Sequence, residues 1–240
     1  MILYPEGWGE SQRILVILAH PDDPEFFCGA TIARWTTAGH RVEYCLLTRG
    51  DKGNDNPDFG GEQVARMREE EQRAAAAVLG VVDVRFLDYP DGYLVADIGL
   101  RREVVRVIRQ VRPDILVTCD PTNLFPRANA INHADHRAAG QAVLDAYYPG
   151  AGNRMFFPEL LEEGLQPHRV KELWLASASQ PNVVLDVTDH WETKLRALHA
   201  HASQIGDPEK FDECMRARHT ADSTAEAPRY EERFYRLIFD

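Results

Sequence analysis

Hydrophobic residues along this chain gather in short unbroken runs that are separated by longer amphipathic stretches. Residues 14–18 read I-L-V-I-L, and residues 115–119 form another nearly continuous apolar run. Short apolar runs rich in β-branched residues are typical of strands buried on both faces, as in a parallel sheet covered by helices. We predict strands at 13–18, 42–48, 83–87, 115–119, 172–176 and 182–186.

Stretches of helical character lie between these runs. Residues 62–79 are rich in Ala, Glu and Arg and are followed by Gly80, a residue that commonly ends a helix. Further helices are predicted at 26–38, 97–111, 137–147 and 189–202, with a short aromatic helix at about 230–238. Strands and helices that alternate at this spacing form right-handed βαβ units. The pattern therefore predicts an α/β fold, in which a Rossmann-like, mostly parallel sheet is flanked by helices.

The length of the chain bounds its domain organisation. A chain of 240 residues, of which 44% are hydrophobic, can bury one substantial core. No internal repeat and no low-complexity linker divides it. We expect a single domain over residues 1–240, with a core at about 12–202 and a C-terminal helical tail at 206–240.

Charge and the lack of long apolar runs narrow the class of protein further. The formal net charge of −11 argues against nucleic acid as the main partner, because its phosphates repel an acidic surface. No apolar run approaches the length that crosses a bilayer, and the first residues lack the pattern of a signal peptide. The 4 cysteines are widely spaced, without a C-x-x-C pair. We expect a reduced, cytoplasmic protein that has no membrane partner.

Two short segments hold an unusual density of metal-ligating side chains. Residues 20–25 follow the first predicted strand and read H-P-D-D-P-E, and residues 133–136 read H-A-D-H. Ligands of open α/β sheets bind just outside the carboxyl ends of the strands, where the first segment would lie. A catalytic zinc takes three His or carboxylate ligands and keeps one position open for water. Two histidines and one aspartate satisfy this count, and a carboxylate and a third histidine remain for acid–base chemistry.

The two segments resemble the paired signatures of the LmbE/PIG-L-like N-acetylglucosaminyl deacetylases, H-P-D-D-x-E and H-x-D-H. Two signatures in the expected order are far more specific than either one alone. The similarity covers most of the chain and extends to the loop at 47–53, to R-x-x-E at 68–71, to D-G at 91–92, to Lys194 and to H-A-S-Q at 201–204. We expect the active site at the C-terminal ends of the strands.

The resemblance implies a metal centre and a base. His20, Asp23 and His136 fall where the family binds zinc, and Fe²⁺ is an alternative occupant of the same site. Asp22 falls where the family has its general base, which acts on the attacking water. A carboxylate can take a proton near neutral pH when the metal lowers the pKa of that water to about 7.

The resemblance also implies the remaining catalytic and substrate-binding residues. His133 falls where the family has a protonated imidazole that stabilises the oxyanion and assists the leaving amine, and Asp135 falls where a carboxylate orients that imidazole. Arg68 and Asp91 are expected to contact the substrate. Hydrolysis of an amide needs an activated water, an electrophile at the carbonyl and a proton donor for nitrogen, so these residues supply each role.

We therefore predict a metal-dependent hydrolase that removes an N-acetyl, or another N-acyl, group from an N-acetylglucosamine-containing small molecule. Its partner would be an N-acetylated sugar or glycoconjugate, and the sequence leaves a homo-oligomer open. Two alternatives are a metal-binding α/β protein without hydrolase activity and an Fe(II) enzyme with a 2-His-1-carboxylate triad. The spare carboxylate of Asp22 argues against the first alternative. The alternation of strands and helices argues against the second, because such triads are usually mounted on β-sandwiches.

Overall fold

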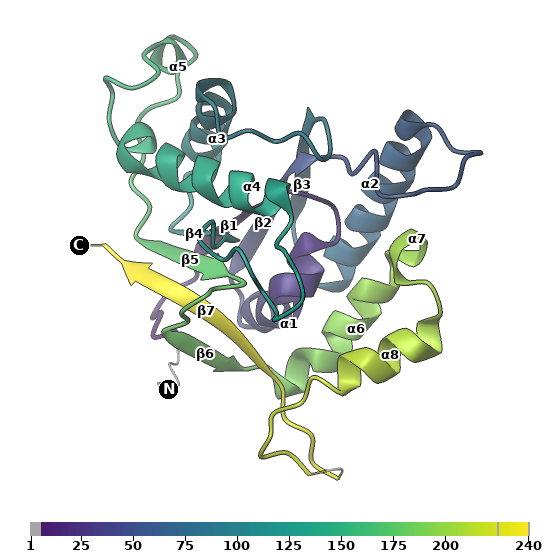
Figure 1. Ribbon diagram of the computed structural model, residues 1–240. Coiled ribbons are helices and arrows are strands. Elements are labelled where there is room, and N and C mark those ends of the chain that lie inside the picture. The colour runs from purple at the N-terminus through teal and green to yellow at the C-terminus, as the bar shows by residue number, and fades with distance from the viewer. Residues whose placement is uncertain (1–5, 225, 240) are drawn as a thin grey trace.

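A seven-stranded sheet with the order β3-β2-β1-β4-β5-β7-β6 runs through the molecule (Figure 1). The computed structural model describes residues 6–224 and 226–239. The strands are β1 Arg13–Leu18, β2 Arg41–Thr48, β3 Asp83–Tyr89, β4 Ile115–Cys119, β5 Glu172–Ala176, β6 Val183–Asp186 and β7 Glu231–Ile238. The first five pair in parallel, whereas β7 is antiparallel to both β5 and β6. The predicted α/β class with a mostly parallel sheet is confirmed.

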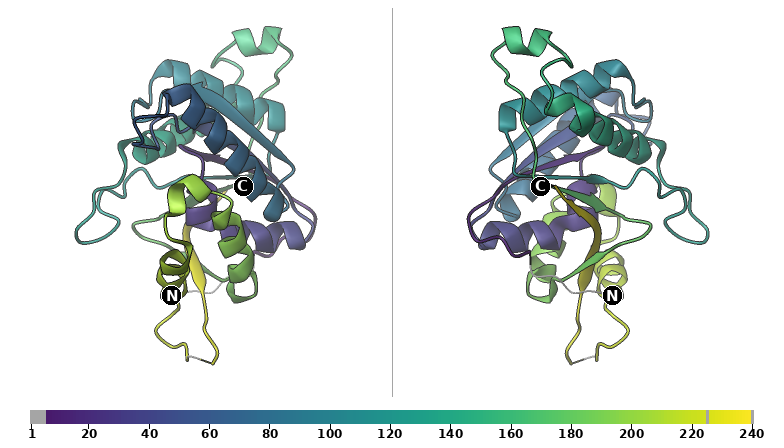
Figure 2. Two further views of the ribbon diagram at one scale, coloured as in Figure 1. Left: turned by 90° about the vertical axis from the view of Figure 1, so that its right-hand side faces the viewer. Right: turned by 90° about the vertical axis from the view of Figure 1, so that its left-hand side faces the viewer.

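The central strand β1 shows why the sheet is buried on both sides. Ile14 and Val16 point into one hydrophobic cluster, whereas Leu15 and Ile17 point into the other. The first cluster is covered by α1 Asp23–Thr37, α2 Gly61–Val78 and α6 Trp191–His199, and the second by α3 Ile98–Val111 and α4 Ala134–Asp145. Side chains alternate across a strand, so a continuous apolar run feeds two cores at once. Figure 2 shows these layers from two sides.

The shorter elements lie mainly after α4. They are η1 Ala146–Ala151, α5 Glu159–Glu162, η2 Thr188–His190, α7 Ala202–Ile205 and α8 Pro208–Arg216. The predicted helix at 137–147 begins earlier than expected, at Ala134, with His133 as its N-cap. This places the whole H-A-D-H segment at the start of a helix rather than in the preceding loop.

The predicted aromatic helix at 230–238 is wrong, because these residues form β7. The strand lies between β5 and β6, with Ile238 opposite Glu172 and Phe234 opposite Val183. Glu232 and Phe234 are buried on the same side of the strand. The buried carboxylate of Glu232 is paired with Lys194 Nζ at 2.6 Å, so tertiary contacts stabilise a charged residue inside the sheet. Within its described residues, 206–224 and 226–239, the segment predicted as a helical tail is thus helical only in α8, and its last part adds β7 to the sheet.

The topology places the site at the point where the strand order reverses. From β1 the chain proceeds outward through β2 and β3, and it then returns to the other side of β1 with β4. Such a switch point opens a crevice outside the carboxyl ends of the two adjacent strands, and ligands of α/β proteins bind there. The turn after β1 and the loop after β4, residues 120–133, border this crevice, and the loop projects from the body of the molecule (Figure 2). Among the described residues, none of the helices has the length and apolar character needed to cross a membrane.

Candidate active site and metal centre

The turn that follows β1 is fixed by its own aspartate. The backbone N–H of His20 donates a hydrogen bond of 2.8 Å to Asp23 Oδ2. Asp23 is the first residue of α1, where a carboxylate is also favoured by the positive end of the helix dipole. Pro24 follows it in the first turn of α1, where its missing N–H is not needed. The turn therefore presents His20 and Asp23 together at the end of β1.

The Asp23 carboxylate lies between two imidazoles. Its Oδ1 is 3.0 Å from His136 Nε2, and its Oδ2 is 3.5 Å from His20 Nδ1. Burial opposes the charged carboxylate, but His136 and His20 outweigh burial and hold the pKa of Asp23 well below its usual range. The structure therefore brings together the three residues that were predicted to bind the metal.

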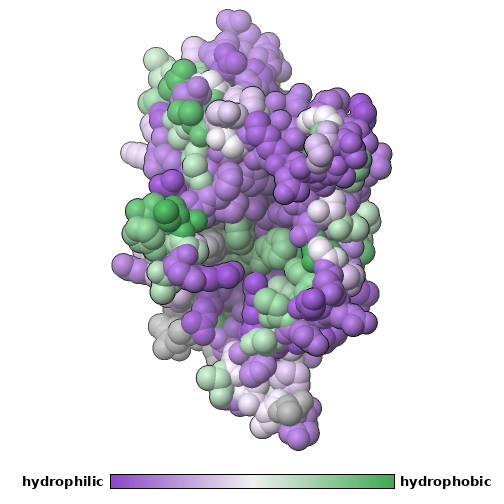
Figure 3. Space-filling model, turned by 45° about the vertical axis from the view of Figure 1, so that its right-hand side comes forward, coloured by the Kyte–Doolittle hydropathy of each residue, from purple (hydrophilic) through white to green (hydrophobic). Residues whose placement is uncertain are grey.

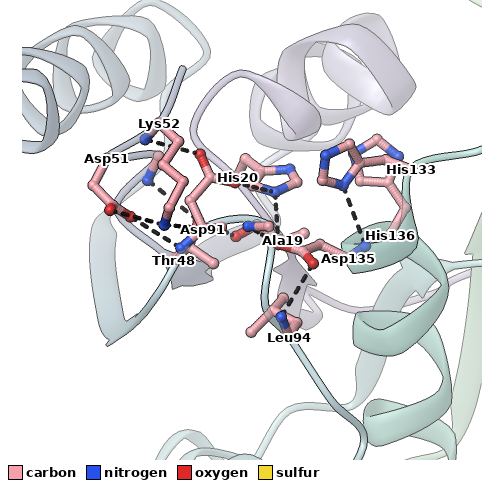
Figure 4. Close-up of polar contacts among 12 residues, drawn as sticks. Ala19, His20, Thr48, Asp51, Lys52, Asp91, Leu94, His133, Asp135 and His136 are labelled. Carbon is pink, nitrogen blue, oxygen red and sulfur yellow. Dashed lines mark hydrogen bonds and ion pairs between the residues drawn. The ribbon is translucent and has the colours of Figure 1, made fainter. Parts of the chain in front are cut away.

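The second ring nitrogen of His20 faces two carboxylates. His20 Nε2 is 3.1 Å from Asp91 Oδ1 and 3.2 Å from Asp135 Oδ2. Burial disfavours the charged imidazole, yet hydrogen bonds to Asp135, Asp23 and Asp91 raise the pKa of His20 to about 12. Figure 4 shows the His20 ring between the Asp91 side chain and the rings of His133 and His136. Asp91, predicted to contact substrate, thus lies against a predicted metal ligand instead of standing free in the cavity.

Asp135 has a different partner from the one predicted. Its carboxylate accepts hydrogen bonds from Gly92 N at 2.7 Å and Leu94 N at 3.1 Å, and it contacts His20, as described above. His133 instead accepts the backbone N–H of Asp135 at its Nδ1, at 3.2 Å. The two residues are two positions apart at the start of α4, so their side chains point in different directions. The Asp135 carboxylate therefore contacts the ring of His20 and not the ring of His133.

The environment of His133 also differs from the prediction of a protonated imidazole. Burial and the neighbouring His20 and His136 hold the pKa of His133 below its usual value, and the Asp135 charge opposes them only partly. Because Nδ1 accepts a hydrogen bond, the neutral ring carries its proton on Nε2. His133 is exposed to solvent, so this nitrogen is available to a ligand.

Asn132 is a site residue that the sequence analysis missed. Its side-chain Oδ1 is 3.1 Å from His136 Nδ1, and its Nδ2 donates a hydrogen bond of 2.7 Å to the Asn123 carbonyl. The amide is thus held in one orientation and accepts from His136, which leaves His136 Nε2 to face Asp23. Its place directly before the H-A-D-H segment was the available signal, but an asparagine in a long loop carries no pattern of its own.

Asp22 and Arg68 form an ion pair at the edge of the cavity. Arg68 is buried, and its Nη2 lies 3.0 Å from Asp22 Oδ2. Burial raises the pKa of Asp22 to about 6, although the Arg68 charge opposes this shift. Gly50 and Gly53 pass so close to the guanidinium that a Cβ at either position would collide with it. Arg68, predicted to bind substrate, is therefore engaged with the predicted base.

These side chains surround one cavity of about 410 Å³. It is lined by His20, Asp22, Asp23, Phe26, Phe27, Lys52, Gly53, Arg68, Asp91, Gly92, His133 and His136. Figure 3 shows a hollow with partly hydrophobic walls inside a largely hydrophilic face. All eight residues that were predicted to act in the site lie in or directly behind this cavity, whereas their individual roles remain predictions. The volume is within the range of small-molecule sites.

The donor set fits a divalent metal ion. His20, His133 and His136 each offer a ring nitrogen within 4.8 Å of the other two, and the Asp23 carboxylate reaches two of these rings. The remaining nitrogens of His20 and His136 are held by oxygen acceptors. Such outer contacts commonly fix the orientation of histidine ligands. Two imidazoles, one carboxylate and an adjoining cavity match a centre with an open position for water or substrate.

Fold and site together define an α/β protein with a candidate metal centre at the carboxyl ends of its strands. The sequence profile of the family described as "PIG-L: GlcNAc-PI de-N-acetylase" matches residues 15–147, which is more than half of the chain. The chain belongs to this family. The family resemblance inferred from the two signatures is thereby confirmed.

Two relatives and one solved structure agree with this assignment. The diacetylchitobiose deacetylase of Thermococcus kodakarensis is 35% identical over 83% of this chain and 73% of the relative. The 1D-myo-inositol 2-acetamido-2-deoxy-alpha-D-glucopyranoside deacetylase of Thermobispora bispora is 30% identical over 81% of this chain and 80% of the relative. The N,N'-diacetylchitobiose deacetylase structure from Pyrococcus horikoshii superposes with a TM-score of 0.85 and 28% identity, over 95% of this chain and 85% of that one.

Proposed function

We propose that this protein is a metal-dependent deacetylase that hydrolyses the N-acetyl amide of an N-acetylglucosamine-containing small molecule. The observation that carries the proposal is the convergence of Asp22, His133 and the His20–Asp23–His136 set on one cavity. Relatives that this chain resembles over about four fifths of its length are named for deacetylation of such sugars. A structural metal site would need neither the additional carboxylate nor the exposed imidazole.

His20, Asp23 and His136 are the residues that we propose hold the metal, with Zn²⁺ as the favoured ion. When bound, the ion acts as a Lewis acid toward the amide carbonyl and lowers the pKa of water. Asp91 and Asp135 keep His20 Nδ1 directed toward Asp23, because both carboxylates accept the proton of its other nitrogen. Asn132 does the same for His136. The chain thus fixes both imidazoles from behind.

Asp22 is the proposed general base. Its pKa of about 6 is close to neutral pH, which suits a group that must take a proton and release it again within one turnover. In the reaction, the water oxygen forms a bond to the acetyl carbon while its proton passes to Asp22. Asp22 then gives this proton to the nitrogen as the C–N bond breaks, and acetic acid, which ionises to acetate, leaves together with the free amine.

His133 is proposed to donate a hydrogen bond to the oxyanion and to assist the leaving amine. Its neutral ring carries the proton on Nε2, since Nδ1 is occupied by the backbone N–H of Asp135. This assignment keeps the predicted role of His133 but attributes it to a neutral donor. In this scheme Asp135 contributes by holding the ring of His20 in place.

The experiment measures release of free amine with fluorescamine from a panel of N-acetylated sugars. The panel contains N-acetylglucosamine, diacetylchitobiose, and the inositol and malate conjugates of N-acetylglucosamine. Zinc-reconstituted protein is compared with metal-stripped protein and with Asp22→Ala. We expect amine from at least one member, and none above background in either control. Amine release that persists in both controls, or tight binding of one metal equivalent without any turnover, would contradict the proposal.

Metal identity, location and assembly are separate parts of the proposal. Protein reconstituted anaerobically with Fe²⁺ is compared with protein reconstituted with Zn²⁺ at equal metal occupancy. We expect amine release from the zinc form. A cytoplasmic location is supported by the four cysteines, all of which are free thiols in the structure. The oligomeric state remains a prediction that light scattering of the purified protein decides.

A further inference from the structure

The backbone of Asp22 adopts a conformation that is unusual for a residue other than glycine. Its φ is 80° and its ψ is −27°, in the left-handed region. Aspartate tolerates this region better than most residues, but it is still disfavoured. Asp22 is the N-cap of α1, yet its side chain makes no capping hydrogen bond to the helix. The left-handed backbone turns the carboxylate away from the helix end, toward Arg68 and the cavity.

Two residues on one face of α2 hold the peptide group that sets this conformation. Arg68 Nη2 donates a hydrogen bond of 2.7 Å to the Pro21 carbonyl, and Gln72 Oε1 accepts the Asp22 N–H at 2.8 Å. The Pro21 carbonyl and the Asp22 N–H belong to the same peptide unit. Positions 68 and 72 are one helical turn apart, so both side chains reach this unit from the same side. A rotated peptide would direct its N–H toward a guanidinium and its oxygen toward an amide oxygen.

Glu25 fixes the orientation of the Gln72 amide. Gln72 Nε2 donates to both carboxylate oxygens of Glu25, at 3.1 and 3.0 Å. A carboxylate accepts but does not donate, so the NH₂ group must face Glu25 and the amide oxygen must face Asp22. Glu25 and Gln72 are both fully buried. Glu25 also contacts Tyr44 Oη at 3.3 Å and His201 Nε2 at 3.1 Å, which hold it in place.

We infer that Gln72 is a positioning residue, which keeps the Asp22 carboxylate directed into the cavity through the orientation of the Pro21–Asp22 peptide, with Glu25 as its support. This inference rests on the proposed function in so far as Asp22 is the base. It also assigns a supporting role to Glu25, the glutamate of the H-P-D-D-P-E segment, which is neither a proposed metal ligand nor a proposed acid or base. It also explains a fully buried glutamine on a helix whose other polar residues are mostly exposed.

The kinetic test replaces Gln72 by Leu, which removes the acceptor of the Asp22 N–H. A base displaced by about 1 Å can lower turnover about 10²-fold, and we expect a decrease of kcat of that order. We expect KM to stay within about twofold and zinc to remain at one equivalent, because Gln72 touches neither the substrate cavity nor the metal ligands. Gln63→Leu, an exposed change on the same helix, is the matched control and keeps the wild-type kcat.

A rescue experiment separates positioning from simple loss of stability. Gln72→Glu sets two buried carboxylates against each other, and we expect a low kcat. Adding Glu25→Gln restores an amide donor between the two side chains and an acceptor for the Asp22 N–H, so the double variant should recover most of kcat. A Gln72→Leu protein with kcat within threefold of wild type would overturn the inference. So would a zinc-loaded double variant that is no more active than Gln72→Glu.

Crystal structures of the wild type and Gln72→Leu provide a readout that needs no activity. The inference requires a positive φ at Asp22 in the wild type and its loss, or two conformers, in the variant. An unchanged Asp22 in the variant overturns the inference even if the proposed function fails. A wild type without amine release would instead contradict the proposed function, so the two failures are distinguishable. If Gln72→Leu does not fold, the Gln72→Glu single and double variants decide the outcome.

Discussion

The turns after β1 and β4 lie side by side at the same edge of the sheet, and each carries a buried aspartate. After β4, Asp120 accepts four hydrogen bonds, from the backbone N–H and hydroxyl of Thr122 and of Ser179. After β1, Asp23 faces two imidazoles and Asp22 faces a guanidinium and the cavity. The donors of Asp120, from Thr122 and Ser179, are neutral. The carboxylates after β1 instead face ionisable partners, which are Arg68 for Asp22 and the imidazoles of His20 and His136 for Asp23.

The pKa values of Asp120 and Asp22 move in opposite directions. Burial alone would raise the pKa of Asp120, but its hydrogen bonds to Ser179 and Thr122 lower it. The pKa of Asp22 is raised to about 6, because burial exceeds the effect of Arg68. A carboxylate that accepts four hydrogen bonds is held in its ionised form, whereas one that is buried with fewer donors can exchange a proton near neutral pH. The comparison separates an aspartate that stabilises a turn from the aspartate that we propose as the general base.

Of the changes in the two turns, Asp23→Ala, in the turn after β1, should produce the largest loss of activity. It removes the carboxylate between His20 and His136, so we expect loss of the bound metal and amine release below detection. Metal analysis of the purified variant and the fluorescamine assay check both expectations. Asp58→Ala, in an exposed loop, is the matched control. Full metal occupancy in Asp23→Ala would show that the metal centre lies elsewhere.

Asp22→Asn should give the next largest effect. The amide keeps the shape of the side chain but cannot take a proton, so kcat should fall about 10²–10⁴-fold. The metal content should remain at the wild-type level, since Asp22 is not a proposed ligand. Steady-state kinetics and metal analysis of the same preparation test this. A kcat near that of the wild type would assign the base to another group.

Asn132→Leu should weaken metal binding without abolishing it. Loss of the acceptor behind His136 frees its ring, and loss of such a contact typically lowers metal affinity about 10–100-fold. Competition with a chromogenic chelator measures the affinity. Asn132→Asp keeps an oxygen acceptor behind His136 but loses the donor to the Asn123 carbonyl, so its metal affinity should lie between those of Asn132→Leu and the wild type. Equal affinity in all three proteins would remove Asn132 from the metal centre.

Asp120→Asn should lower the free energy of unfolding and leave kcat almost unchanged. The amide can no longer accept all four hydrogen bonds, and we expect a loss of about 1–3 kcal/mol in the free energy of unfolding at pH 7. The folded-state pKa of Asp120 is below its ordinary value of 3.8, so its stabilisation is present above that pH and is lost below it. The difference between variant and wild type should therefore narrow below pH 3.8.

Denaturant unfolding at pH 7 and at lower pH values, together with kcat at pH 7, tests the Asp120 prediction. A large decrease in kcat at full folding would place Asp120 in the active site. That result would break the contrast between the two turns.

Much of the fold could be predicted because the signals are local. The apolar run of β1 and the strand β5 were predicted with the boundaries that the structure has. The strand β7 was missed because its charged and aromatic residues resemble an amphipathic helix. Its conformation depends on pairing with β5 and β6, and its buried Glu232 depends on Lys194. Because β5, β6 and Lys194 all lie far from β7 in the sequence, a local pattern of residues does not indicate these contacts.

Six of the eight site residues were predicted from the two signatures, whereas several of their contacts were not. The signatures place His20 and Asp135 in the site, but only the fold brings these residues together 115 positions apart in the chain. Gln72 lies 50 positions from the Asp22 N–H that it accepts, and it belongs to no signature. The residue types in a motif indicate which chemistry a site can perform. The hydrogen-bond partner of each side-chain atom, however, is set by how the sheet and its helices pack together.

The position of β7 has a consequence for the synthesis of the chain. Between β5 and β6 the only described strand is β7, which is made more than forty residues after β6. A nascent chain therefore carries β5 as an unpaired edge until residues 231–238 have left the ribosome. Exposed strand edges recruit other strands, and vulnerable folding intermediates expose them. Ribosome-bound chains halted before residue 231 should therefore depend on chaperones, and release of β7 from the ribosome should end that dependence.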